Sequence, residues 1–293
     1  MEKMEPALLR IGGELPIHRM GFGTMQLTGP GVWGPPKDEA NAREVLRRAV
    51  DIGVDFFDTA DVYGPGDCER IIREALHPYP PSLVIATKAG LLRSGPATRE
   101  RPGISINASE SHIRRALEGS LRALGRECID LFQLHRIDPT IPVEETMEVF
   151  RALRDEGKIR HIGLSEVSVN EIERARSVVE IATVQNIYNL ALRKHEDVLA
   201  YCERHQIAFI PFWPLHSGAL AKSAAMVSIV ARTSATSAQV ALAWLLRKSP
   251  SIVLIPGTSS VQHLEENVAA TKVELADADM VALDQLGMTA VQE

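Results

Sequence analysis

The chain has 293 residues, of which 45% are hydrophobic, and its formal net charge at pH 7 is −6. The acidic balance argues against a general binder of nucleic acid or of anionic membranes. No apolar run approaches the roughly 18 residues of a membrane-spanning helix, and the N-terminus lacks the apolar core of a secretion signal. The cysteines Cys68, Cys128 and Cys202 form no CxxC pair, so no disulfide framework is expected. These features predict a soluble, cytoplasmic protein with reduced cysteines.

Strand-like apolar runs alternate with amphipathic helical runs along the chain. The expected strands are 17–25, 54–58, 83–88, 129–135, 159–165, 182–187, 207–212 and 251–256. Clear helical stretches include 39–53, 109–125, 143–157 and 237–249. Strands that are apolar throughout are typical of a parallel sheet covered on both faces. Eight such units without a composition break predict an α/β fold, a (β/α)8 TIM barrel that forms one domain over residues 1–293.

Three further elements are expected around this barrel. Gly12 and Gly13 predict a small hairpin across the barrel bottom, and the chain is expected to end in a helix. The Gly-, Pro- and Arg-rich segment 92–105 follows the third strand and is expected to be a mobile loop over the site.

Polar side chains occur where the expected strands end, and in such barrels this edge carries the active site. Asp58, Lys88 and His135 end strands two, three and four, and Tyr63 lies in the loop after Asp58. Each has an ordinary alternative when taken alone: a turn cap, a solvated strand end, a hydrogen-bonded core histidine and a packing tyrosine. Because adjacent strands converge on one barrel mouth, we expect the four side chains to lie together.

This set of residues suits the protonation of a carbonyl oxygen. A tyrosine has a reference pKa of about 10, too high for an efficient proton donor near neutrality. A buried ammonium beside the phenol would lower its pKa, and a carboxylate would keep the ammonium charged. A histidine next to the phenol would orient the carbonyl. The set contains no electron source, so a hydride donor must be bound.

Several motifs in order resemble those of the aldo-keto reductases, from about Met20 to Leu286. They are DTADVYG (58–64), ATK (86–88), DLFQLH (130–135), IRHIGLSE (159–166), VQNIYN (184–189), FWPLHSG (212–218) and IPGTSSVQHLEEN (255–267). The resemblance implies a barrel enzyme that reduces aldehydes or ketones with a nicotinamide cofactor, usually NADPH. It assigns Tyr63 as proton donor, Lys88 and Asp58 as the groups that set its pKa, and His135 as the group that orients the carbonyl.

The same resemblance implies a cofactor site. Ser165 and Gln185 would hold the nicotinamide carboxamide, and Phe212 would stack on its ring unless it is ordinary core packing. The segment from Thr258 would cover the adenosine end, where a helix N-terminus suits a phosphate, although Thr-Ser-Ser is equally a plain helix cap. The full set is Gly23, Thr24, Met25, Asp58, Ser165, Gln185, Phe212, Trp213, Pro214, Leu215, Ser217, Gly218, Pro256, Gly257, Thr258, Ser259, His263, Glu266 and Asn267.

Two departures from the family pattern concern the cofactor. Many relatives have Ser-Asn where this chain has Ser165 and Glu166, and an ionised glutamate cannot donate a hydrogen bond to a carboxamide. Gly257 and His263 stand where many NADPH-using relatives carry Lys and Arg around the 2′-phosphate. NADP(H) is still the expected cofactor, with NAD(H) or use of both as the alternative.

The expected substrate is a small carbonyl compound in an apolar pocket. Its expected lining is Met25, Trp33, Tyr63, Leu91, His135 and Trp213, although Trp33 alone would also serve to pin its loop. The stretch GPGVWGPPKD resembles a bacterial branch compared with pyridoxal reductases, which makes pyridoxal one candidate among many. A non-catalytic nicotinamide-binding subunit on the same barrel is the alternative function. A metal site is not expected, because no HxH follows strand one. The protein is expected to be a monomer.

Overall fold

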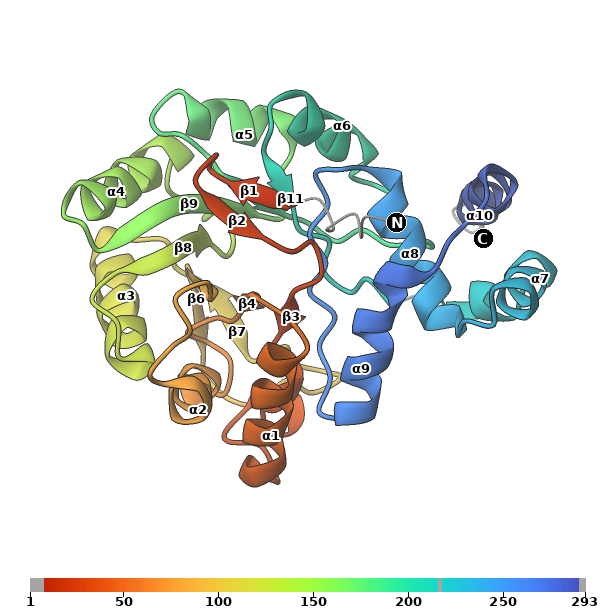
Figure 1. The fold of residues 1–293 in the computed structure, drawn as a ribbon. Coiled ribbons are helices and arrows are strands. Elements are labelled where there is room, and N and C mark those ends of the chain that lie inside the picture. Colours follow the sequence, from red (N-terminus) through yellow and green to blue (C-terminus); the bar gives the residue numbers. More distant parts are fainter. Residues whose placement is uncertain (1–7, 216–217, 290–293) are drawn as a thin grey trace.

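The computed structural model describes residues 8–215 and 218–289, and a parallel barrel lies at the centre of the molecule (Figure 1). Seven strands pair in the order β11-β10-β9-β8-β5-β4-β3. They are β3 (Phe22–Gly23), β4 (Phe56–Asp58), β5 (Val84–Ala89), β8 (Ile129–Leu134), β9 (Ile159–Ser165), β10 (Thr183–Gln185) and β11 (Ala208–Phe209). Residues 252–254 fill the eighth position through parallel bridges from Ile252 to Phe209 and from Leu254 to Met20. The predicted (β/α)8 barrel is therefore confirmed.

Helices surround the barrel and cover its outer face (Figure 1). They are α1 (Glu39–Asp51), α2 (Asp67–Leu76), α3 (Glu110–Leu124), α4 (Val143–Asp155), α5 (Val169–Arg176), α6 (Glu196–Arg204), α8 (Ser237–Lys248) and α9 (Val261–Ala269). Two more helices, α7 (Ala224–Thr233) and α10 (Asp277–Thr289), lie farther out, and α7 packs against α8 and α10 (Figure 1). Short 3-10 turns are η1 (Met25–Leu27), η2 (Pro30–Val32), η3 (Gly218–Lys222) and η4 (Ala270–Lys272). Within the described ranges, no helix combines the length and the apolar character needed to cross a membrane.

Side chains between the barrel and its helices form the larger part of the core. Phe150 of α4 stacks on Phe132 of β8 with ring centroids 5.1 Å apart. Such a pair contributes about 0.5–1.5 kcal/mol beyond the burial of its area. Helix ends are fixed by local chemistry, since α5 and α8 begin at capping boxes of Ser168 with Glu171 and of Thr236 with Gln239.

The expected N-terminal hairpin is present and closes one end of the barrel. Strands β1 (Leu9–Ile11) and β2 (Leu15–Ile17) pair antiparallel. Ile11 and Ile17 are fully buried in one cluster with interior barrel residues such as Phe56 and Leu131. This plug leaves the opposite end, where the strands terminate, for a site. The expected C-terminal helix is α10.

The segment 92–105, expected to be a mobile loop over the site, has a short strand at each end that was not expected. Strands β6 (Leu91–Arg93) and β7 (Ile104–Ile106) pair antiparallel at its two ends. The hairpin is held at its base because the Asn107 N–H donates to the Gly90 carbonyl at 3.0 Å. The Pro, Gly and Arg residues between the strands obscured two short apolar runs in the sequence. Leu91, Arg93 and Ile104 of this hairpin form part of the wall of the site.

Candidate active site

A buried ion pair lies at the ends of β4 and β5. Asp58 and Ala86 are in register, which brings Lys88 beside Asp58, and the Lys88 side chain is fully buried. Lys88 Nζ lies 2.5 Å from Asp58 Oδ1 and also donates to the Thr59 carbonyl at 2.8 Å. A charge removed from water in this way requires a partner and hydrogen bonds, and both are present.

The second oxygen of Asp58 is also engaged. Its Oδ2 accepts from Gln185 Nε2 at 2.8 Å and from Gln133 Nε2 at 3.2 Å. Gln133 is a contact that the sequence analysis missed, because a single amide in the apolar run of β8 gives no signal of its own. The network fixes the carboxylate, and through it the ammonium, in one position.

Tyr63 reaches this pair from the loop after β4. Gly64 and Gly66 both have positive φ angles, 70° and 81°, in the region that glycine enters without strain. The chain thereby turns so that Lys88 Nζ lies 5.2 Å from the centroid of the Tyr63 ring. The His135 ring stands edge-on to it, with centroids 6.1 Å apart at 79°. The structure thus brings together all four residues expected to be catalytic.

The pKa of Tyr63 differs in direction from the expected one. Burial raises the pKa of the phenol above its ordinary value, and the nearby Lys88 ammonium offsets this only in part. Burial acts to lower the pKa of Lys88, but Asp58 and Tyr63 outweigh it, so the pKa of the ammonium is raised. The prediction of a net lowering for Tyr63 was therefore wrong, because it counted the charge and omitted desolvation. Tyr63 is protonated and Lys88 is charged near neutral pH.

His135 is neutral in this environment. Burial, followed by the charges of Lys88, Arg136 and Arg93, holds its pKa well below the ordinary range. Among the described residues, no hydrogen-bond partner meets its buried Nδ1. A neutral ring beside the phenol can orient a carbonyl oxygen without competing as an acid.

A cavity of about 360 Å³ opens above these residues at the barrel mouth. Of the residues expected at the site, it is lined by Gly23, Thr24, Met25, Asp58, Tyr63, Leu91, His135, Ser165, Gln185, Phe212, Trp213, Pro214, Leu215, Pro256 and Gly257. Further lining residues that the sequence analysis did not assign are Gln26, Val62, Arg93, Ile104, Arg136 and Ile255. Lys88 lies beneath Tyr63 and is fully buried.

Some expected residues lie outside this cavity. Trp33 is 40% exposed in the loop after η2 and does not line it. Gly218 begins η3, while Ser217 falls outside the described residues. The expected adenosine-end residues lie beyond the cavity. Thr258 and Ser259 precede α9, His263 lies in its first turn, and Glu266 and Asn267 lie in its second half.

One wall of the cavity is made of main chain, because two glycines allow the backbones to approach closely. A Cβ atom on Gly23 would lie 2.6 Å from the Ile255 carbonyl oxygen, and one on Gly257 would lie 2.6 Å from the Gly23 carbonyl oxygen. Neither position accepts a side chain unless backbone moves. The departure at Gly257 from the basic residues of many relatives thus has a steric reason in this structure.

The remaining polar groups of the cavity fit a nicotinamide. Ser165 supplies a hydroxyl, Gln185 an amide and Phe212 a flat ring, all lining the same cavity. A carboxamide needs both donors and acceptors, and this donor set provides them. Arg136 lies between two of these groups: its Nη1 donates to Ser165 Oγ at 3.0 Å, and its Cζ is 5.9 Å from the Phe212 ring centroid.

Glu166 has a local structural contact in place of a cavity position. Its φ of 55° lies in the left-handed region, where asparagine is favoured among non-glycine residues. The Ile187 N–H donates to Glu166 Oε1 at 2.6 Å, and Lys194 Nζ lies 3.4 Å from Oε2. The glutamate therefore joins the end of β9 to the segment after β10.

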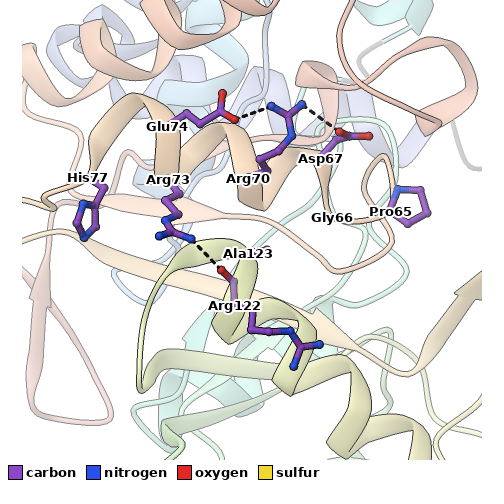
Figure 2. Close-up of a pocket in the computed structure, with 9 residues that line it drawn as sticks. All are labelled: Pro65, Gly66, Asp67, Arg70, Arg73, Glu74, His77, Arg122 and Ala123. Carbon is purple, nitrogen blue, oxygen red and sulfur yellow. Dashed lines mark hydrogen bonds and ion pairs between the residues drawn. The ribbon is translucent and has the colours of Figure 1, made fainter.

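A second hollow, of about 690 Å³, lies on the outside of the barrel between α2 and α3 (Figure 2). Arg70 pairs there with Asp67 at 3.1 Å and with Glu74 at 2.7 Å, and it also pairs with Glu39. Arg73 donates to the Arg122 carbonyl at 3.2 Å. These contacts tie the helices together and are remote from the strand ends that carry Tyr63 and Lys88.

Throughout the described ranges, no group of three or more His, Cys, Asp or Glu side chains is placed to hold a metal ion.

Comparisons with known proteins agree with this geometry. The model of the Aldo/keto reductase family matches residues 19–287. An uncharacterized oxidoreductase of Schizosaccharomyces pombe is 45% identical over 94% of this chain and 88% of its own length. Pyridoxine 4-dehydrogenase of Escherichia coli is 41% identical over 93% of this chain and 96% of its own length.

A solved structure gives the same result for the fold. The crystal structure of an aldo-keto reductase from Klebsiella pneumoniae in complex with NADPH superposes with a TM-score of 0.80. The alignment covers 97% of this chain and 95% of that one, at 27% identity. A family match over most of the chain, together with these relatives, shows that the protein belongs to the aldo/keto reductase family.

Proposed function

We propose that the protein reduces an aldehyde or a ketone to the alcohol, with NADPH supplying the hydride and Tyr63 supplying the proton. The expected class of enzyme, an oxidoreductase of the aldo/keto reductase family, is confirmed by the family match and by the oxidoreductases among its relatives. The residue roles are the proposal. The observation that carries them is the phenol of Tyr63 beside a buried ammonium, 5.2 Å from its ring, at the mouth of a lined cavity.

Each catalytic side chain has a task that follows from its environment. Tyr63 keeps its proton because its pKa is raised, and it gives the proton up only when the carbonyl oxygen becomes an alkoxide, which is a much stronger base than a phenolate. Lys88 stabilises the phenolate that the transfer leaves, because an ammonium in a water-poor site interacts strongly with a new negative charge. Asp58 keeps Lys88 charged and in place. His135, neutral and edge-on to the phenol, positions the carbonyl oxygen.

NADPH is the proposed cofactor, since the similar Klebsiella pneumoniae protein has been solved in complex with it. Ser165, Gln185 and Phe212 would hold the nicotinamide, and the N-terminus of α9 would face the adenosine-end phosphate. No lysine stands at 257, and the exposed His263 takes the place of an arginine. NADH, or use of both cofactors, is therefore kept as the alternative.

A direct assay tests the proposal. NADPH and NADH oxidation would be followed with a panel of aromatic, aliphatic and pyridoxal-type aldehydes, the last because of the pyridoxine 4-dehydrogenase relative. Turnover of at least one class supports the function. Tight binding of NADPH with no turnover across the panel would instead favour a non-catalytic nicotinamide-binding subunit, an alternative that gains no support from the oxidoreductase relatives.

The pH dependence tests the protonation states. The pKa of His135 is lowered well below the ordinary 6.5, and the pKa values of Tyr63 and Lys88 are raised above 10.0 and 10.5. None of the three titrates near neutrality, so we expect kcat/KM for reduction to be flat between about pH 6 and pH 8. Initial rates at constant ionic strength would measure this. A rise on acidification with a midpoint near 6.5 would mean that His135 itself acts as the acid.

The cofactor preference can be shifted at position 263. His263 is exposed in the first turn of α9, so His263→Arg adds a fixed cation where the 2′-phosphate is placed. We expect the ratio of kcat/KM with NADPH to that with NADH to rise about tenfold, as for one charge-assisted hydrogen bond. Gln262→Arg adds the same charge one residue earlier, about 100° around the helix, and should change the ratio less. An unchanged ratio in His263→Arg would refute this placement of the phosphate.

A further inference from the structure

Two arginines line the cavity, and the proposed reduction gives neither of them a role. Arg93 belongs to β6 of the hairpin above the site, and Arg136 directly follows His135. Their charges reach the catalytic centre, since both contribute to the lowered pKa of His135. Together with Lys88 they place three cations around the point where the carbonyl would be reduced.

Arg93 is anchored by main-chain contacts. Its Nε donates to the Val62 carbonyl at 2.9 Å and its Nη1 to the Gly31 carbonyl at 3.3 Å. A guanidinium carries five N–H donors in a planar fork, and Nη2 takes no part in these bonds. The side chain is therefore held at the cavity wall with donors left for a ligand.

Arg136 is also fixed and largely withdrawn from water. Its Nη1 donates to the His135 carbonyl at 2.5 Å and to Ser165 Oγ at 3.0 Å. Burial lowers its pKa, but a guanidinium stays charged in proteins. Here too, Nη2 is not used by these bonds.

Within the described part of the chain, neither arginine is in direct contact with a carboxylate, although the charge of Glu166 acts on Arg136 from a distance. No ion pair joins either of them to a carboxylate in the residues that the structure describes. Asp58, the carboxylate in the lining, is already engaged by Lys88, Gln185 and Gln133. Glu166 is held by the Ile187 N–H and Lys194. Partly buried guanidiniums are ordinarily paired, so a cavity with two such groups favours an anionic occupant.

We propose that Arg93 and Arg136 bind a carboxylate on the substrate, so that the preferred substrates are carbonyl compounds that also carry an acid group. The inference rests on the proposed reductase function and narrows its substrate class. Guanidinium and carboxylate match in geometry, and their hydrogen bonds are about twice as strong as neutral ones. The carboxylate would fix the molecule by its far end while the carbonyl faces Tyr63.

A matched pair of aldehydes tests this proposal. 4-Carboxybenzaldehyde and methyl 4-formylbenzoate share one skeleton and differ in charge. The ester group withdraws more electron density, so intrinsic reactivity favours the neutral compound. We expect the acid to have a kcat/KM higher by about tenfold or more, mainly through a lower KM, as for charge-assisted hydrogen bonds. Equal values, or a preference for the ester, would overturn the inference and leave the reductase function intact.

Substitutions at Arg93 and Arg136 test whether these side chains cause the preference for the acid over the ester. Arg93→Met and Arg136→Met should each reduce the acid-to-ester ratio severalfold, and Arg93→Lys and Arg136→Lys should retain part of it because the charge remains. Arg101→Met is the matched control, because Arg101 is exposed in the segment between β6 and β7 and does not line the cavity. The acid-to-ester ratio of this variant should equal that of the unaltered protein. A ratio that is unchanged in both cavity methionine variants would contradict the assignment.

The cofactor also carries anionic groups, its phosphates, to which the arginines could bind. A measurement of NADPH binding distinguishes this from binding of a substrate carboxylate. NADPH dissociation constants, obtained by protein fluorescence, should be nearly the same in the unaltered protein and in the Arg93 and Arg101 variants. Arg136→Met also loses a hydrogen bond to Ser165, so its NADPH binding should weaken, but by less than its KM for the acid rises. A weakening of NADPH binding as large as the rise in KM for the acid, seen in the Arg93 and Arg136 methionine variants alike, would assign the arginines to the cofactor and overturn the inference.

A binding readout that needs no turnover completes the test. Benzoate and benzamide have equal size and differ in charge. With NADPH present, we expect benzoate to bind more tightly by calorimetry, and this preference should fall in the Arg136→Met variant. Preferential benzoate binding with no turnover of any aldehyde would count against the proposed function while supporting the anion site.

Discussion

Replacing Tyr63 by Phe is expected to lower kcat for carbonyl reduction by about 10²- to 10⁴-fold, the range for loss of a general acid. The change removes one oxygen atom and leaves the ring that lies beside Lys88 and His135. Binding of NADPH should be nearly unaffected, because the groups proposed to hold the nicotinamide are Ser165, Gln185 and Phe212. Steady-state rates with an aromatic aldehyde and NADPH titration by fluorescence measure the two quantities separately.

A second tyrosine provides the control for this variant. Tyr79 lies outside the cavity, and its hydroxyl donates to the Leu124 carbonyl at 2.7 Å. Tyr79→Phe makes the same chemical change and loses this hydrogen bond without touching the site, so its kcat should stay within about twofold, even if stability falls by about 1 kcal/mol. Substantial turnover in Tyr63→Phe would show that the proton comes from another group.

Lys88→Met is expected to damage both stability and catalysis. Removing one partner of a buried ion pair leaves an uncompensated charge, and such changes cost about 3–5 kcal/mol in free energy of unfolding. Asp58 would be the charge left behind, since Lys88 Nζ is 2.5 Å from its Oδ1. Catalysis should fall as well, because the phenolate that forms on Tyr63 would lose its neighbouring cation. Urea unfolding and steady-state rates would measure the two effects.

The double variant Lys88→Met with Asp58→Asn separates these effects. It removes both charges, so much of the lost stability should return. Activity should stay low, since the cation beside Tyr63 is still absent. Recovery of both stability and rate would mean that Lys88 serves the fold alone, which would contradict its role in catalysis.

Most of the fold was predictable because its signals are local. Each barrel strand is a short apolar run, and the buried face of each major helix repeats every three or four residues, as in Val143, Met147 and Phe150 of α4. The hairpin β6–β7 was missed for the converse reason. Its strands have three residues each, and the Gly- and Pro-containing segment between them resembles a loop.

Site residues at the ends of barrel strands could be predicted from the sequence. Residues on an unpredicted element, and pKa shifts caused by burial, could not. Asp58 and Lys88 lie at the ends of β4 and β5, and His135 directly follows β8, so the neighbouring strands of the barrel bring them together. Arg93 was not assigned because its hairpin was not predicted. The direction of the Tyr63 pKa could not be obtained from its neighbours in sequence, since the largest cause is desolvation by the whole fold.

The close backbone contact between Gly23 and Gly257 determines where the specificity of this enzyme can evolve. Side chains cannot be added at either position without moving main chain, so point mutations have little access to that part of the pocket. Arg93 and Ile104 of the β6–β7 hairpin also line the pocket and lie outside the buried core of the barrel, so they can vary in size and charge with less effect on the barrel than buried residues such as Leu91. Directed evolution toward new carbonyl compounds would therefore do best with libraries concentrated on this hairpin.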